Sequence, residues 1–156
     1  MFFLGCHLID MIVGIMGEPE RIVPFLKSTG IEGTTSEDYC MAILEYKNGV
    51  SFAKCCAAEA GGGDRRQVVI CGTEKTVEIK PIEVYDEGSN MHAVVSYYPD
   101  GGGKPENSVN SEIFDRYDGM MRSFAEKIRG VAENPYSPDY ELMVYKCVLK
   151  ACGREV

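Results

Sequence analysis

Residues 38–60, DYCMAILEYKNGVSFAKCCAAEA, carry the pattern that decides the fold. Two runs rich in apolar residues flank Asn48-Gly49, the favoured type I′ turn of a two-residue β-hairpin. Such a turn predicts the register of the strands, with Lys47 opposite Val50 and Glu45 opposite Phe52. We therefore expect two antiparallel strands joined by this turn.

The two faces of this hairpin differ in the size of their side chains. The smaller face combines Cys40, Ala42, Leu44 and Tyr46 with Ser51, Ala53, Cys55 and Ala57. The larger face combines Tyr39, Met41, Ile43 and Glu45 with Phe52, Lys54, Cys56 and Ala58. Small side chains let a layer of helices approach closely, whereas the larger face is too apolar to be left in water. We expect helices on the first face and a second subunit of a homo-oligomer on the open second face.

Three helices are expected outside the hairpin. The first spans 4–16 and ends at Gly17, with Pro19 beyond it; the second lies near 118–133; the third starts at the N-cap Ser137 and ends at Gly153. Their expected apolar faces are Leu8, Ile12, Ile15 and Met16; then Met121, Phe124, Ala125, Ile128 and Val131; then Leu142, Tyr145, Leu149 and Cys152.

The remaining apolar runs predict short strands. They lie at 21–25, 67–72, 76–80, 82–85 and 91–98, and Pro24 would confine the first to a sheet edge. Short connections favour antiparallel pairing, and 99–108 is expected to be a loop. The order of elements predicts an α+β fold, a large and mainly antiparallel open sheet with helices on one face, in a single domain over 1–156.

Composition excludes several classes of function. The chain has 156 residues and a net charge of −8, without the clustered Lys and Arg that a nucleic-acid surface needs. The apolar stretch 1–16 is too short to span a membrane and lacks the basic start of a signal peptide. Seven cysteines without a C-x-x-C motif are interpreted as buried free thiols, with no metal-ligand set. These features predict a cytoplasmic protein without nucleic-acid or membrane partners.

His7 and Asp10 are the clearest candidates for chemistry. Three residues apart on a helix, both project from one side, and a histidine acts as acid or base near neutral pH. The Asp10 carboxylate could orient the imidazole or bind a substrate hydroxyl. The alternative is a structural pair, which spacing alone favours by about two to one.

The glycine cluster Gly61–Gly63 is followed by Arg65 and Arg66, two candidates for binding an acidic ligand. Since a strand follows rather than Lys-Ser/Thr and a helix, a connecting loop with solvated arginines is the favoured interpretation. No G-x-G-x-x-G motif follows a strand, so the sequence predicts no dinucleotide site of the Rossmann type.

Four segments together resemble the C-terminal domain of the glucose-fructose oxidoreductase, inositol dehydrogenase and MocA (Gfo/Idh/MocA) family. They are GCHLIDMIVGIMGEPERI, the hairpin with NGVSFA, RRQVVICGTEKTVEIKP and NPYSPDYELMVYKCVLKACG, and they extend over nearly the whole chain. The resemblance implies an open sheet that packs against another subunit. It also implies a separate N-terminal Rossmann domain, absent from these residues, that binds NAD or NADP; no cofactor is expected in this chain itself.

The resemblance further implies that the whole protein oxidises a secondary alcohol of a sugar or polyol, and that this chain alone is inactive. His7 matches the family's acid–base histidine, and Asp10 matches an acidic position near the substrate. Two positions depart from the family pattern. Phe3 stands where many members have Asp, and Lys75 stands where a glycine is usual. Phe3 therefore keeps an alternative open: a non-catalytic member, or a stand-alone domain, that serves in sheet-mediated assembly or binds a small ligand.

Overall fold

The hairpin forms as an antiparallel pair, but its register differs from the expected one by two residues. In the computed structural model, which describes residues 1–85, 91–101, 103–115 and 117–156, β2 (Tyr39–Tyr46) pairs with β3 (Gly49–Cys56). Glu45 lies opposite Val50 and Tyr46 opposite Gly49, so the loop consists of Lys47 and Asn48.

The turn explains why the predicted register was wrong. A type I′ turn needs positive φ at both central residues, and among the described residues other than glycine only Glu32 has positive φ. Gly49 is therefore the first residue of β3 instead of a central turn residue. A shift of two residues keeps every side chain on its predicted face, because side chains alternate with a period of two.

The chain divides into two compact units, and each is described by itself. The first comprises 1–60 and 134–156, and the second comprises 61–133. The single domain expected over 1–156 stays a prediction.

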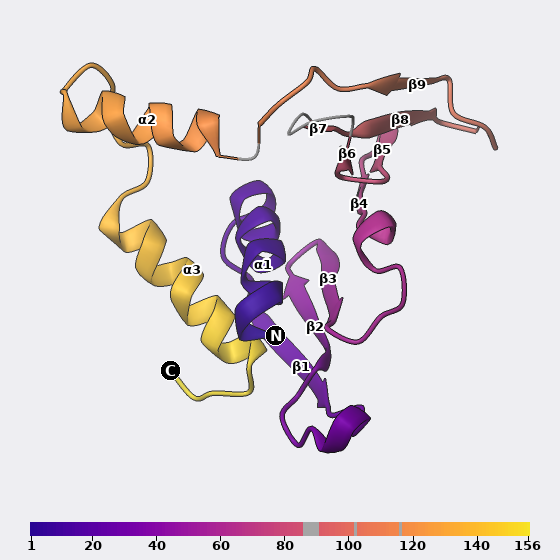
Figure 1. The fold of residues 1–156 in the computed structure, drawn as a ribbon, viewed down its shortest axis with the longest axis vertical. Helices are drawn as coiled ribbons and strands as arrows, with labels where there is room; N and C mark the ends of the chain where they lie inside the picture. The colour runs from indigo at the N-terminus through magenta and orange to yellow at the C-terminus, as the bar shows by residue number, and fades with distance from the viewer. Residues whose placement is uncertain (86–90, 102, 116) are drawn as a thin grey trace. The chain divides into compact units, whose positions relative to one another are not determined.

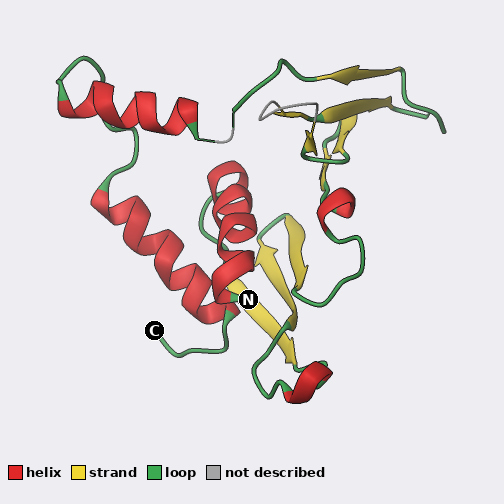
Figure 2. Ribbon diagram, viewed as in Figure 1, coloured by secondary structure: helices red, strands yellow, loops and turns green. Residues whose placement is uncertain are grey.

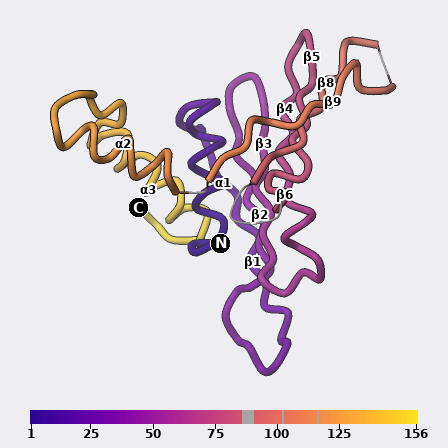
Figure 3. Tube along the Cα trace, turned by 45° about the horizontal axis from the view of Figure 1, so that its top comes forward, coloured from indigo at the N-terminus to yellow at the C-terminus, as the bar shows by residue number. Residues whose placement is uncertain are grey.

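In the first unit, β1 (Arg21–Lys27), β2 and β3 form a three-stranded antiparallel sheet with β1 at its edge, as Pro24 predicted. A loop that contains the 3-10 turn η1 (Ile31–Gly33) connects β1 to β2 beyond the end of this sheet (Figure 3). The helices α1 (Phe2–Met16) and α3 (Pro138–Ala151) lie side by side against one face of the sheet (Figures 1 and 2). That face carries the small side chains, so the expected helix layer is confirmed.

The core of this unit joins both helices to the sheet. Its buried members are Ile9, Val13, Ala42, Leu44, Ala53, Cys147, Val148 and Ala151. The small residues on the sheet and on α3 permit the close approach that the hairpin pattern predicted.

The helices bury other faces than the expected ones. α1 buries Gly5, Ile9 and Val13, whereas Ile15 and Met16 of the predicted stripe are 59% and 42% exposed. α3 buries Cys147, Val148 and Ala151, whereas Leu142 and Tyr145 are exposed. Both corrections have one cause: where helices approach a sheet closely, small residues are favoured at the contact, while the prediction selected large apolar side chains.

The second unit consists mainly of antiparallel strands. The sheet order is β4 (Val68–Cys71), β5 (Lys75–Ile79), β8 (Val94–Pro99) and β9 (Asn107–Asn110). A separate ladder pairs β6 (Val84–Tyr85) with β7 (Met91–His92). The α+β class with antiparallel strands is confirmed, and the described strands form three sheets instead of one large sheet.

Two details of this unit correct the prediction. The expected loop 99–108 is shorter, because 107–110 forms β9 against β8. Its sequence, NSVN, has low strand propensity, so it is a strand only through its partner. The helix α2 (Asp118–Ile128) ends five residues before the expected boundary, since Gly130 takes a left-handed conformation with φ of 70°. Met121, Phe124, Ile128 and Val131 of its expected apolar face are exposed, and Ala125 is partly buried.

Candidate functional site

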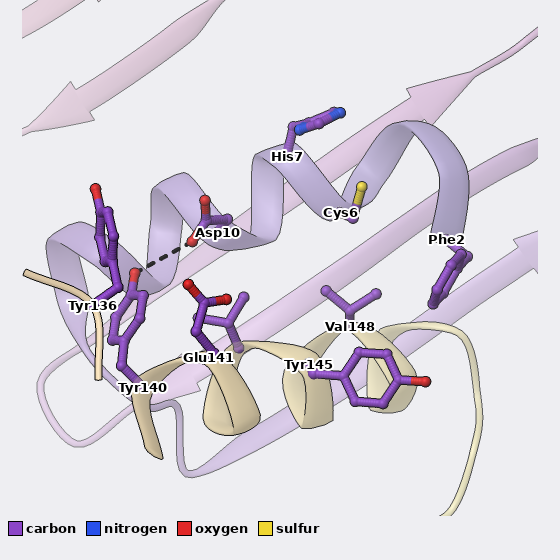
Figure 4. A pocket seen from close by; sticks show the side chains of 10 residues that line it. Phe2, Cys6, His7, Asp10, Tyr136, Tyr140, Glu141, Tyr145 and Val148 are labelled. Carbon is purple, nitrogen blue, oxygen red and sulfur yellow. Dashed lines mark hydrogen bonds between the residues drawn. The ribbon is translucent and has the colours of Figure 1, made fainter. Parts of the chain in front are cut away.

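An open groove of about 400 Å³ lies between α1 and α3, entirely within the first unit. Its volume falls in the range of small-molecule sites, roughly 300–1,000 Å³. Ten residues line it: Phe2, Cys6, His7 and Asp10 from α1, and Tyr136, Tyr140, Glu141, Val144, Tyr145 and Val148 from α3 and its approach (Figure 4). Both residues singled out on the first helix thus belong to one groove.

The start of α3 determines where its groove residues lie. Ser137 is the N-cap, its hydroxyl accepts a hydrogen bond of 3.1 Å from the backbone N–H of Tyr140, and Pro138 follows as the first helical residue. This cap, predicted from the sequence, places Tyr140 in the first turn. Tyr140, Val144 and Val148 then follow one another at intervals of four along the groove.

Asp10 is held by a residue far away in the sequence. The hydroxyl of Tyr140 donates a hydrogen bond of 3.3 Å to Asp10 Oδ1. Partial burial raises the pKa of the Tyr140 phenol, and so do the negative charge and the hydrogen bond of Asp10. The phenol therefore remains protonated, as the donor in this bond, above the pH at which a free tyrosine ionises.

His7 occupies the rim of the groove, and its side chain is exposed. In Figure 4 the imidazole projects from the side of α1 that faces away from α3, whereas Asp10 turns toward Tyr140. No hydrogen bond joins His7 to Asp10 among the described residues. Hence Asp10 does not orient the ring in this structure, and the imidazole is free to meet a ligand from solvent.

The two other candidate residues belong to the second unit. Arg65 ends the 3-10 turn η2 (Gly63–Arg65) of the predicted loop, and Arg66 follows it. Arg66 Nη1 forms an ion pair of 2.8 Å with Glu83 Oε2. The groove is formed by the first unit alone, so neither arginine lines it.

Three tyrosines of the groove were not predicted as site residues from the sequence. The rings of Tyr136 and Tyr140 lie 5.5 Å apart between centroids, with an angle of 31° between their planes. Tyr145 was assigned to the apolar face of its helix but is about half exposed at the groove. The spacing of tyrosines at 136 and 140, four residues apart beside a helix start, is the only local signal that marked them.

The cysteines are all free thiols, and their burial varies. Cys40 and Cys147 are buried, four others are partly buried, and Cys71 is exposed. Burial raises the pKa of the Cys147 thiol, and the nearby Glu18 carboxylate raises it further. Cys6, the one thiol that lines the groove, donates a long hydrogen bond of 3.5 Å to Phe3 O.

In 1–85, 91–101, 103–115 and 117–156, no group of three His, Cys, Asp or Glu side chains is placed to hold a metal ion. Among the same residues, none of the helices combines the length and the apolar composition that crossing a membrane requires.

The described residues do not fit a nicotinamide dinucleotide. Such a cofactor rests on a glycine-rich turn from a parallel strand into a helix N-terminus. Here every described ladder is antiparallel, and the glycine cluster at 61–63 leads into a short 3-10 turn and then into β4. Any chemistry that this chain contributes therefore comes from its own side chains.

Comparison with known proteins identifies the family. The model of the GFO/IDH/MocA C-terminal domain matches residues 1–78, which include α1, the three-stranded sheet and the start of the second unit. The chain belongs to the GFO/IDH/MocA family. It is a C-terminal domain of these oxidoreductases, and the resemblance recognised in its sequence is confirmed.

Two solved structures extend the likeness beyond the matched half. A "putative oxidoreductase" from Klebsiella pneumoniae is 18% identical with a TM-score of 0.70, and the match covers 98% of this chain and 46% of that one. The YPO2259 "putative oxidoreductase" from Yersinia pestis is 18% identical with a TM-score of 0.63. That match covers 96% of this chain and 46% of the Yersinia chain. The GFO/IDH/MocA domain thus shares their fold and spans about half of their length. No curated protein matches the chain.

Proposed function

We propose that this domain is the substrate-binding half of an NAD- or NADP-dependent oxidoreductase that acts on a secondary alcohol of a sugar or polyol in the cytoplasm. The observation that carries the proposal is the exposed imidazole of His7 at the rim of the α1–α3 groove, beside Asp10. Family membership supports the class of reaction. The dinucleotide would be bound outside the described residues, because none of them fits it.

In this proposal the chain's own groups bind the alcohol and move its proton. His7 accepts the hydroxyl proton during oxidation and returns it during reduction, which suits an exposed imidazole near neutral pH. Asp10 Oδ1 is occupied by the Tyr140 hydroxyl, so Asp10 Oδ2 is the oxygen that would accept a hydrogen bond from a neighbouring substrate hydroxyl. Tyr140 thereby acts as a positioning residue for Asp10.

The decisive experiment is His7→Ala in the full-length protein, assayed by absorbance of the reduced nicotinamide over a panel of sugars and polyols. Loss of a general acid–base group should lower kcat by about 10²–10⁴-fold. Met11→Ala is the matched control, since Met11 is an exposed residue of the same helix that does not line the groove. Unchanged turnover in His7→Ala would remove His7 from the mechanism. The folded 156-residue chain alone should bind no NADH in a calorimetric titration.

One observation favours a second candidate, a member of the family without catalytic activity. Phe3 is 85% exposed in the first turn of α1, where the family resemblance leads us to expect a carboxylate. No acidic residue occupies this first turn. Binding of one sugar by the full-length protein, without any cofactor reduction across the panel, would favour this candidate over the enzyme.

The open face of the three-stranded sheet supports a further part of the proposal, assembly into a homo-oligomer. Phe25, Val50 and Phe52 are 51%, 66% and 66% exposed on the face opposite the helices. Neighbouring apolar side chains of this size mark an interaction surface in soluble proteins. A second copy of the same chain offers the same apolar face and would cover it in a two-fold dimer.

A further inference from the structure

We propose that the α1–α3 groove selects a polyol that carries an amine, with its ammonium group against the carboxylates of Asp10 and Glu141. The inference rests on the proposed function, because the groove is the one that His7 borders, and it names the charge of the substrate. It is carried by the ionisable groups, the aromatic rings and the hydrogen bonds of the groove together.

The charges of the groove favour a cation. Asp10 and Glu141 both line it, and none of the ten lining residues is Lys or Arg. In the described part of the chain, neither carboxylate forms an ion pair, in contrast to Glu45, Glu83 and Glu106, which pair with Arg21, Arg66 and Lys75. A ligand ammonium would therefore supply a counter-charge that the groove itself does not contain.

The hydrogen bond from Tyr140 makes Asp10 a directional acceptor. Since Oδ1 already receives the Tyr140 hydroxyl, the carboxylate is held in one orientation and Oδ2 remains as an acceptor. Figure 4 shows Glu141 in the first turn of α3, directly after Tyr140, on the side of the helix toward Asp10. A donor with several N–H groups, such as an ammonium, can bond to both acids at once, whereas a single hydroxyl donates only once.

The aromatic rings add a second attraction for the same group. The pair Tyr136 and Tyr140 presents π faces at one end of the groove, and Tyr145 and Phe2 lie at its other end. An ammonium over a tyrosine face is attracted by the ring quadrupole, while the apolar C–H face of a sugar ring packs on the same surface. The groove thus combines contacts for a polyol ring with contacts for a positive charge.

The same groups disfavour an anionic sugar. A phosphate or carboxylate is normally recognised by Arg, Lys or clustered backbone N–H donors. Placed in this groove, it would meet two carboxylates and no Lys or Arg among the lining residues. Sugar phosphates and uronic acids are therefore expected to bind more weakly than neutral sugars.

The test compares four ligands that share one ring: glucosamine, glucose, glucuronate and glucose 6-phosphate. Their dissociation constants are measured by calorimetry on the full-length protein without added dinucleotide, at about pH 7, where most of an amine is protonated. We expect glucosamine to bind about fivefold more tightly than glucose, and both anions to bind more weakly than glucose. Equal or tighter binding of either anion, or no binding of glucosamine, would overturn the proposal.

Variants assign the preference to the groove. Asp10→Asn and Glu141→Gln should each lower the preference for glucosamine over glucose to about twofold or less. Asp139→Asn removes the same charge from the first turn of α3 outside the groove and should leave the preference unchanged. A preference that persists in both groove variants, or is lost in Asp139→Asn, would place the amine elsewhere.

The outcomes separate this inference from the proposed function. Turnover of neutral and amine-bearing polyols with equal kcat/KM would keep the oxidoreductase and remove the charge selection. A binding preference for the amine, without turnover of any alcohol, would keep the charge selection and remove the oxidoreductase.

Discussion

The hydroxyl of Tyr140 donates a hydrogen bond to Asp10 across 130 residues of sequence. The bond joins the helix that carries His7 to the helix that closes the chain, at the edge of the groove between them. It therefore links the stability of the α1–α3 pair to the geometry of the candidate site.

Tyr140→Phe removes this bond and keeps the ring. We expect a small loss of thermal stability, roughly 1–4 °C in Tm, because a partly exposed hydrogen bond contributes modestly. We also expect KM for a sugar substrate to rise more than kcat falls, since Asp10 would lose its orientation while His7 stays in place. Tyr117→Phe, which removes the hydroxyl of an exposed tyrosine that does not line the groove, is the control. A larger effect on kcat than on KM would contradict the positioning role.

The same tyrosine predicts a pH dependence. Its pKa is raised in the folded protein, so the folded state holds the phenol proton more tightly than the unfolded state does. The resulting stability is complete below the pKa of an unfolded tyrosine, about 10, and is lost as pH rises through the folded pKa. Burial raises the pKa of Tyr46, and the hydrogen bond to Glu78 raises the pKa of Tyr98, so ultraviolet titration of the phenols should show several tyrosines that ionise late. Tyr140→Phe should remove one of them, and a late component of unchanged amplitude would exclude Tyr140.

Substitution of two isoleucines of α1 by alanine tests which face of this helix is buried. Ile9→Ala should destabilise the fold by about 2–5 kcal/mol, because Ile9 is fully buried in the core. Ile15→Ala should change the free energy of unfolding by less than about 0.5 kcal/mol, because that side chain is 59% exposed. Urea denaturation followed by circular dichroism measures both values. Equal losses would mean that Ile15 is covered in the full protein.

If two copies assemble through the open sheet face, a single charge introduced on that face should separate them. Phe52→Glu places a carboxylate on the apolar face opposite Ile43, where a second copy would have to bury it, so the dimer should dissociate. Sedimentation velocity of the wild type and the variant gives the oligomeric state directly. Asn48→Asp, in the hairpin loop, also adds one negative charge and is the matched control. A wild type that sediments as a monomer would refute assembly through this face.

The ends of the helices were predicted from the sequence because they depend on residues that are close together in the chain. Ser137 and Pro138 were identified as the start of α3, and Gly17 and Gly153 as helix ends, because caps depend on neighbouring residues. The division of the hairpin into a small and a large face was also predicted. Residue spacing alone was enough for these features.

Features that depend on packing were not predicted. The buried line Gly5, Ile9 and Val13 follows from how closely α1 approaches the sheet, and hydrophobicity did not reveal it. β9 exists because β8 lies beside it. The partner of Asp10 lies 130 residues away, beyond the reach of any spacing rule. His7 and Asp10 were found in one groove, but Tyr136, Tyr140 and Glu141 entered the site only through the structure.

The displaced register of the β2–β3 hairpin has a consequence for how this loop can change during evolution. Insertion or removal of two residues beside Lys47 and Asn48 would leave every inward side chain inward. A change by one residue would instead turn Ala53 outward and bring Phe52 against the helices, where only small groups fit. Length variation in this loop should therefore occur in even steps.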